Sequence, residues 1–81
     1  MNFEINMHDV VVLLEDAQTQ HFESGQPLLL RRGQIGTVVM TYQDGARELE
    51  FADRDGRAFA SLPLPPDPLM GLHDAPDFAA A

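Results

Sequence analysis

The sequence contains no cysteine and no lysine, and each absence excludes a kind of chemistry. Without cysteine the chain has no disulfide, no thiolate nucleophile and no cysteine-based zinc site. Five arginines are the only strongly basic side chains, and they stand against 13 Asp and Glu residues, which gives a formal net charge of −8. A field of this sign repels nucleic acids and anionic lipids, and it attracts basic proteins.

Long apolar runs are also absent, since none approaches the roughly 18 residues that a membrane span requires. The opening residues 1–4 contain no basic segment of the kind that begins an export signal. These features predict a cytoplasmic protein with no membrane partner. The 81 residues suffice for one small domain, which buries only about 60% of the surface that its unfolded chain exposes. A core of this size is too small to favour a catalytic cleft. Formation of a homodimer is an alternative source of stability.

Short apolar or alternating segments separated by turn residues predict an all-β fold of five strands. Residues 9–14 are apolar on both faces, which predicts a first strand buried on both sides. The next three strands are expected at 34–42, 46–52 and 57–62, joined by turns that contain Asp-Gly pairs. In the third strand the alternation places two large apolar residues inward and two glutamates outward, namely Leu49 and Phe51, and Glu48 and Glu50.

Four prolines between residues 63 and 68 predict an irregular or 3₁₀ connector, which a short closing strand at 69–73 follows. Residues 17–32 have no steady period and predict a long loop after the first strand, with a helical turn near 16–23 as an alternative. This order of elements is that of an SH3-like barrel. We expect one such domain over residues 1–73 and a frayed acidic and alanine-rich tail over residues 74–81.

Four segments carry a family resemblance, in the order DVVVLL at 9–14, RGQIGTVV at 32–39, ELEFAD-x-DGR at 48–57 and LMGLH at 69–73. Together they resemble the small bacterial proteins of domain of unknown function 4926, over nearly the whole chain. The resemblance implies an SH3-like barrel without established catalytic residues. For some members it also implies an antitoxin or immunity role towards a toxin-like enzyme.

The stretch Arg-Gly-x-x-Gly-x-Val at 32–38 also resembles KOW domains and the SH3-like domain of nitrile hydratase β subunits. These resemblances imply, as alternatives, an RNA-associated barrel or an accessory domain of a metalloenzyme. A phosphate-binding loop is disfavoured because Gly33 and Gly36 lead into a strand and not into a helix. Gly33 is expected to permit a turn, and Gly36 a bend or a close approach.

Two His-Asp pairs, His8-Asp9 and His73-Asp74, would meet if the first and last strands paired. Two imidazoles and two carboxylates are a donor set that suits zinc. The simpler interpretation makes these pairs polar caps at strand ends, and we predict no cofactor. The acidic side chains of the strands and turns are expected to be solvated, so we predict no catalytic residue and no enzyme activity.

The favoured function is a module that binds one basic protein partner through the long loop and its surroundings. Phe22 and Tyr42 are the predicted aromatic anchors. The rest of the predicted surface comprises Glu15, Asp16 and Glu23, which would attract the partner, together with His21, Arg31 and Arg32. An equally weighted alternative places Phe22 in the core, where it plugs the open end of the barrel.

Overall fold

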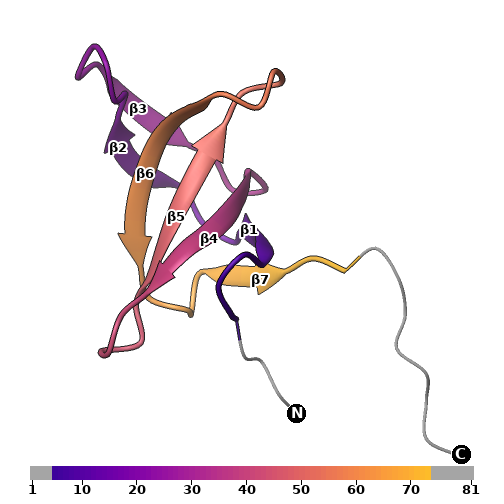
Figure 1. Ribbon diagram of the computed structural model, residues 1–81. Coiled ribbons are helices and arrows are strands. Elements are labelled where there is room, and N and C mark those ends of the chain that lie inside the picture. Colours follow the sequence, from indigo (N-terminus) through magenta and orange to yellow (C-terminus); the bar gives the residue numbers. More distant parts are fainter. Residues whose placement is uncertain (1–4, 74–81) are drawn as a thin grey trace, which may run out of the picture.

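The computed structural model describes residues 5–73, which form seven strands and no helix. The strands are β1 (Val10–Leu13), β2 (Ala17–Gln20), β3 (Pro27–Leu30), β4 (Ile35–Thr41), β5 (Arg47–Ala52), β6 (Ala58–Leu64) and β7 (Leu69–Gly71). Five of them form one antiparallel sheet in the order β6-β5-β4-β1-β7, and β2 and β3 pair as a separate hairpin (Figure 1). The prediction of an all-β fold is confirmed, but the described residues contain seven strands where five were expected, and the five-stranded sheet does not close into a barrel.

Tight turns explain how β4, β5 and β6 follow one another in the sheet. Gly45 and Gly56 adopt φ values of 93° and 82°, which glycine tolerates without steric cost. The Oδ1 atom of Asp53 accepts hydrogen bonds from the backbone N–H groups of Asp55 and Arg57, at 2.9 and 3.0 Å. Both predicted Asp-Gly turns are therefore present, and each is stabilised within a few residues of sequence.

The core lies on one face of the sheet and is built from alternate residues of each strand. Leu49 and Phe51 of β5 are fully buried, as predicted, while Glu50 is exposed and Glu48 half-buried. The remaining large core side chains are Ile5, Val11, Leu13, Leu30, Val38 and Leu69. Together with Leu49 and Phe51 these residues come from β1, β3, β4, β5 and β7 and from the segment before β1, so long-range contacts hold the domain together.

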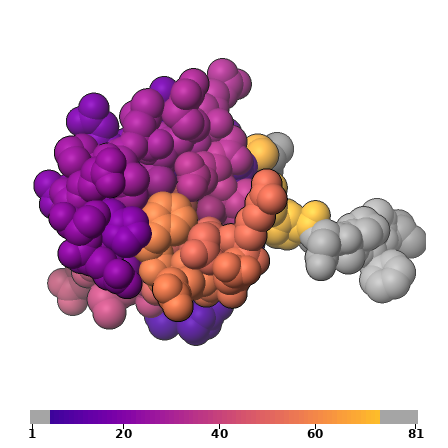
Figure 2. All heavy atoms as spheres, turned by 90° about the horizontal axis from the view of Figure 1, so that it is seen from above, coloured from indigo at the N-terminus to yellow at the C-terminus, as the bar shows by residue number. Residues whose placement is uncertain are grey.

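The prediction of a long loop over 17–32, or of a helical turn within it, was wrong, because these residues form the β2–β3 hairpin. The hairpin lies against β6 (Figures 1 and 2). The backbone N–H of Phe22 donates to the carbonyl of Phe59 at 2.9 Å, and the hydroxyl of Thr19 donates to the carbonyl of Ser61 at 3.1 Å. The ring of His21 stacks on Phe59 with centroids 6.3 Å apart. These contacts cover the outer edge of β6.

Two further expectations needed correction. The first strand is not buried on both sides, since Val10 and Leu14 are exposed. Pro63 lies within β6, where an edge strand tolerates the missing N–H. The proline-rich connector is a single hydrogen-bonded turn, in which the N–H of Leu69 donates to the carbonyl of Pro66 at 3.0 Å, and it is not a 3₁₀ helix. The predicted frayed tail, 74–81, lies outside the described residues.

The five-stranded sheet is open, with β6 and β7 as its two edges. The hairpin lies beside β6, and β7 forms the opposite margin (Figure 1). Within residues 5–73 no helix is long and apolar enough to cross a membrane.

Candidate functional site

The face of β4, β1 and β7 that points away from the core carries six apolar side chains, which we call the outer face. Val12 of β1 lies directly opposite Ile35 of β4 on one side and Met70 of β7 on the other. Directly opposed residues of antiparallel strands share a face, so these three side chains form one row. The members of the outer face are Val10, Val12, Leu14, Ile35, Met70 and Leu72.

The outer face is open to water. Ile35 is 57% exposed and Met70 49%, and only Val12, at the centre of the row, is half-buried. Contiguous apolar surface of this kind on a small protein commonly marks an interaction site. Next to it, Thr37 of β4 lies opposite Glu50 of β5, and the sheet becomes acidic. An apolar centre beside a charged rim is the usual organisation of a protein interface.

A pocket lies at the start of β7, on the other side of the sheet. Its walls are apolar, from Leu13, Leu64, Pro65 and Pro68 among others, and the acidic residues Glu15, Asp16 and Asp67 complete its lining. Leu13 is a core residue, so this pocket, which we call the acidic pocket, is on the inner side of β1. Such a lining suits a side chain with an apolar stem and a cationic head.

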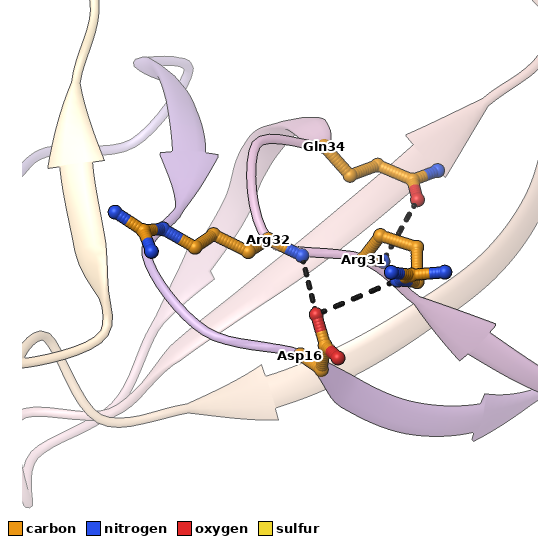
Figure 3. Close-up of polar contacts among 4 residues, drawn as sticks. All are labelled: Asp16, Arg31, Arg32 and Gln34. Atoms are coloured by element: carbon orange, nitrogen blue, oxygen red, sulfur yellow. Dashed lines mark hydrogen bonds and ion pairs between the residues drawn. The ribbon is translucent and has the colours of Figure 1, made fainter.

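Asp16 has structural partners of its own (Figure 3). Its Oδ1 atom accepts a hydrogen bond from the backbone N–H of Arg32 at 2.7 Å, and it lies 3.7 Å from the Nε atom of Arg31. The backbone N–H of Arg31 in turn donates to the side-chain oxygen of Gln34 at 3.4 Å. Asp16 therefore ties the end of β1 to the β3–β4 connection, and the Arg31 side chain faces an acid of the same chain.

Gly33 lies in this same connection and has a φ of 93°. The backbone N–H of Gly33 donates to the carbonyl of Leu13 at 2.7 Å. The predicted role of Gly33 in a turn is confirmed.

The eight residues predicted as one partner-binding surface lie in three separate places. His21, Phe22 and Glu23 are at the tip of the β2–β3 hairpin, where the backbone N–H of Glu23 donates to Nδ1 of His21 at 3.2 Å. Phe22 is 55% exposed, so the alternative that placed it in the core is wrong. The second group, near the base of the hairpin, comprises Glu15, Asp16, Arg31 and Arg32.

Tyr42, the last of the eight residues, lies in the turn between β4 and β5. This turn is at the opposite end of the molecule from the tip of the β2–β3 hairpin (Figure 1). Its hydroxyl donates a hydrogen bond to the Glu48 carboxylate at 2.9 Å. This hydrogen bond is the main cause that raises the pKa of Tyr42 above its ordinary value of 10.0, and the negative charges of Glu48 and Asp44 act in the same direction. Tyr42 and Phe22 therefore cannot contact one small epitope together.

The predicted pairing of the first and last strands is present, because β1 and β7 are neighbours. His8, Asp9 and His73 consequently line one groove together with Val10 and Leu72. Asp74, the fourth residue of the zinc hypothesis, lies outside the described residues. Within residues 5–73 no three histidine or acidic side chains converge on a position that would hold a metal ion.

The outer face itself was missed in the sequence, although its residues were visible there. Val10 and Val12 were assigned to burial because residues 10–14 are apolar at every position. A strand that is apolar on both faces is buried on both only when a second layer covers it. In the described residues no second layer covers the outer face of β1. The apolar residues of the run that point to this face are therefore exposed.

Comparison with protein families matches residues 7–71 to the Domain of unknown function (DUF4926). The chain belongs to this family. The match spans all seven strands of the DUF4926 domain and thus almost the whole outer face. No curated protein and no solved structure matches the chain.

Proposed function

We propose that this DUF4926 domain is a non-enzymatic protein-binding module, an open SH3-like barrel that binds one basic protein partner. The observation that carries the proposal is the outer face, where Val12, Ile35 and Met70 form a continuous apolar row in contact with water. Burial of such side chains is favourable by about 25 cal/mol for each Å² removed from water. A partner that covers the row therefore gains binding energy without any rearrangement of the sheet.

The charge of the chain supports a basic partner. The formal net charge is −8, and Glu50 borders the outer face on its β5 side. Complementary charge of this kind accelerates association and selects among partners, and the effect weakens as salt screens it. A basic toxin-like enzyme that the domain neutralises or escorts in the bacterial cytoplasm is the partner we propose.

The non-enzymatic part of the proposal is supported by where the acidic groups lie. Six carboxylates of the strands and turns could suggest acid-base chemistry. Five of them are exposed to water, namely those of Glu15, Asp16, Glu50, Asp53 and Asp55. The sixth, Glu48, is half-buried and accepts the hydrogen bond from the Tyr42 hydroxyl. General acid-base catalysis needs a carboxyl group that its surroundings shift towards neutral pH, which requires removal from water or close like charges.

The test is a pull-down of the tagged chain from its own cell extract at low and at high salt, with two matched double variants. Ile35→Thr/Met70→Thr removes two exposed apolar side chains from the outer face, and Phe22→Thr/Leu29→Thr removes two from the hairpin, where they are 55% and 51% exposed. The same basic protein should be retained at low salt by the wild type and by the hairpin variant. The outer-face variant should lose it, and high salt should release it.

The design separates the outer face from the surface predicted from sequence alone. Loss of the partner by the hairpin variant but not by the outer-face variant would move the site to the tip that carries Phe22. Retention of no basic protein by the wild type would contradict the proposed function itself.

A further inference from the structure

We infer that the partner contributes an extended segment that adds to the sheet along the free edge of β7, with apolar and basic residues in alternation. This inference rests on the proposed protein-binding function and names how the partner is held. Addition of a strand to an exposed sheet edge is a common mode of peptide recognition, in which backbone hydrogen bonds supply affinity and alternate side chains supply specificity.

The two edges of the sheet differ. The carbonyl groups of Phe59 and Ser61 on the outer edge of β6 accept hydrogen bonds from the β2–β3 hairpin. No segment within residues 5–73 pairs with the outer edge of β7. An uncovered edge presents unpaired backbone donors and acceptors, which proteins usually cover or protect. The edge of β7 is therefore the place in the described structure where a strand of another chain can join.

The ladder between β1 and β7 shows which backbone groups point outward. The N–H of Leu14 donates to the carbonyl of Pro68 at 2.7 Å, and the N–H of Leu72 donates to the carbonyl of Val10 at 3.0 Å. In an antiparallel pair the residues that bond to the neighbour alternate with residues that point away. Since Pro68 and Leu72 bond to β1, the N–H and carbonyl of Gly71 face the open edge.

The side chains around this edge define the chemistry of the added strand. Met70 and Leu72 extend the outer face to the last strand of the sheet, so residues of the partner that point to this side are apolar. Residues that point to the other side reach towards the acidic pocket, where Glu15 and Asp67 are exposed next to the start of β7. Successive side chains of a strand point to opposite faces, so alternating apolar and basic residues satisfy both sides.

The charge of the chain argues for a different protein, and against a second copy, as the occupant. Pairing two copies through β7 would bring together two chains of net charge −8 and place their acidic pockets near one another. Like-charge juxtaposition opposes association, whereas lysine or arginine in the added strand is attracted.

The experiment uses the full chain and a short synthetic peptide of alternating valine and lysine as the probe. Titration followed by amide NMR should give the dissociation constant, shifts at residues 69–73 and protection of the Gly71 amide from exchange. A peptide of alternating valine and glutamate, and one with valines and lysines in two blocks, are the control probes. Both should bind much more weakly.

Two variants at one position test the backbone contact. Gly71→Pro removes the outward N–H and leaves the β1 ladder intact, and we expect about tenfold weaker binding. Gly71→Ala is the matched control, because an added Cβ would meet only Nε2 of His73 at 3.7 Å, and binding should change less than about twofold.

Should proline distort β7, Asp67→Lys provides a second test, with Asp55→Lys in the distant β5–β6 turn as its control. Only Asp67→Lys should weaken binding of the lysine peptide.

Peptide binding that Gly71→Pro and Asp67→Lys leave unchanged, or an absence of binding, would overturn the inference. So would a dimer in light scattering that Gly71→Pro dissociates, since a second copy would then occupy the edge. If the pull-down partner depends on Ile35 and Met70 but not on Gly71 or Asp67, the edge inference fails while the protein-binding function stands.

Discussion

Gly36 and Phe51 lie in such close contact that the glycine position has no room for a side chain. A Cβ atom built on Gly36 would lie 2.8 Å from Cε1 of Phe51 and 3.1 Å from its Cζ. Gly36 is in β4 and Phe51 in the neighbouring strand β5, where it is fully buried. The aromatic ring thus occupies the space over the glycine, and its position depends on the missing Cβ.

Replacing this glycine should therefore destabilise the core. We expect Gly36→Ala to lower the free energy of unfolding by about 1–3 kcal/mol, the usual cost of overpacking a core. In the double variant Gly36→Ala/Phe51→Leu the smaller side chain makes room, so the loss should be less than the sum of the two single losses. Urea denaturation of the four proteins measures both effects. Strict additivity would show that the contact is not the cause.

Asp16 should matter more for stability than the arginine beside it. Asp16→Ala removes the acceptor for the backbone N–H of Arg32, and we expect a loss of about 1 kcal/mol in the free energy of unfolding. Arg31→Ala should change it by less than about 0.5 kcal/mol, because both partners of this 3.7 Å ion pair are exposed. Thermal denaturation with Asp16→Asn as the conservative control checks the order. Equal losses of unfolding free energy in Asp16→Ala and Arg31→Ala would show that the ion pair, and not the hydrogen bond to the backbone, is the cause.

The phenol of Tyr42 should titrate above its ordinary range. It is the only tyrosine, and the chain has no tryptophan, so phenolate absorbance reports this one group. The hydrogen bond to Glu48 favours the protonated form, which raises the pKa above 10.0, and Glu48→Gln should move it back towards that value. An identical titration midpoint in the wild type and Glu48→Gln would refute this assignment.

The sign of the stability effect follows from the raised pKa of Tyr42. Below pH 10 the phenol is protonated in both the folded and unfolded states, and its contribution to stability is fully present. Above pH 10 the unfolded chain loses the proton first, so stability falls as the pH rises through the pKa of the folded state. Tyr42→Phe should lack this part of the alkaline decline, as denaturation at several pH values would show.

Phe22 should contribute little to folding despite its size. Its side chain is more than half exposed at the hairpin tip, so Phe22→Ala should alter the free energy of unfolding by less than about 0.5 kcal/mol. Phe51→Ala, which empties the core, should cost about 3–5 kcal/mol. Chemical denaturation of the two variants compares them directly. A large loss for Phe22→Ala would place that ring in contacts that the structure does not contain.

The parts of the fold that depend on neighbouring residues were visible in the sequence. Alternation over 47–52 predicted which residues of β5 are buried, and the Asp-Gly pairs predicted the turns on either side of it. Gly33 and Gly36 were correctly separated as a turn glycine and a close-packing glycine, because each role is imposed by backbone geometry.

The parts decided by tertiary structure are those in which distant segments meet. Residues 17–30 have a weak strand pattern and become a hairpin where they dock on β6, through contacts of Thr19, His21 and Phe22. Val10 is exposed because no second layer covers its face of the sheet, and the residues next to Val10 in the sequence do not determine the number of layers. Composition determined a small acidic domain, and local patterns determined its all-β class, because strand alternation and turns depend on neighbouring residues. Only packing decided which apolar residues remain in contact with water, since burial is a property of the whole chain.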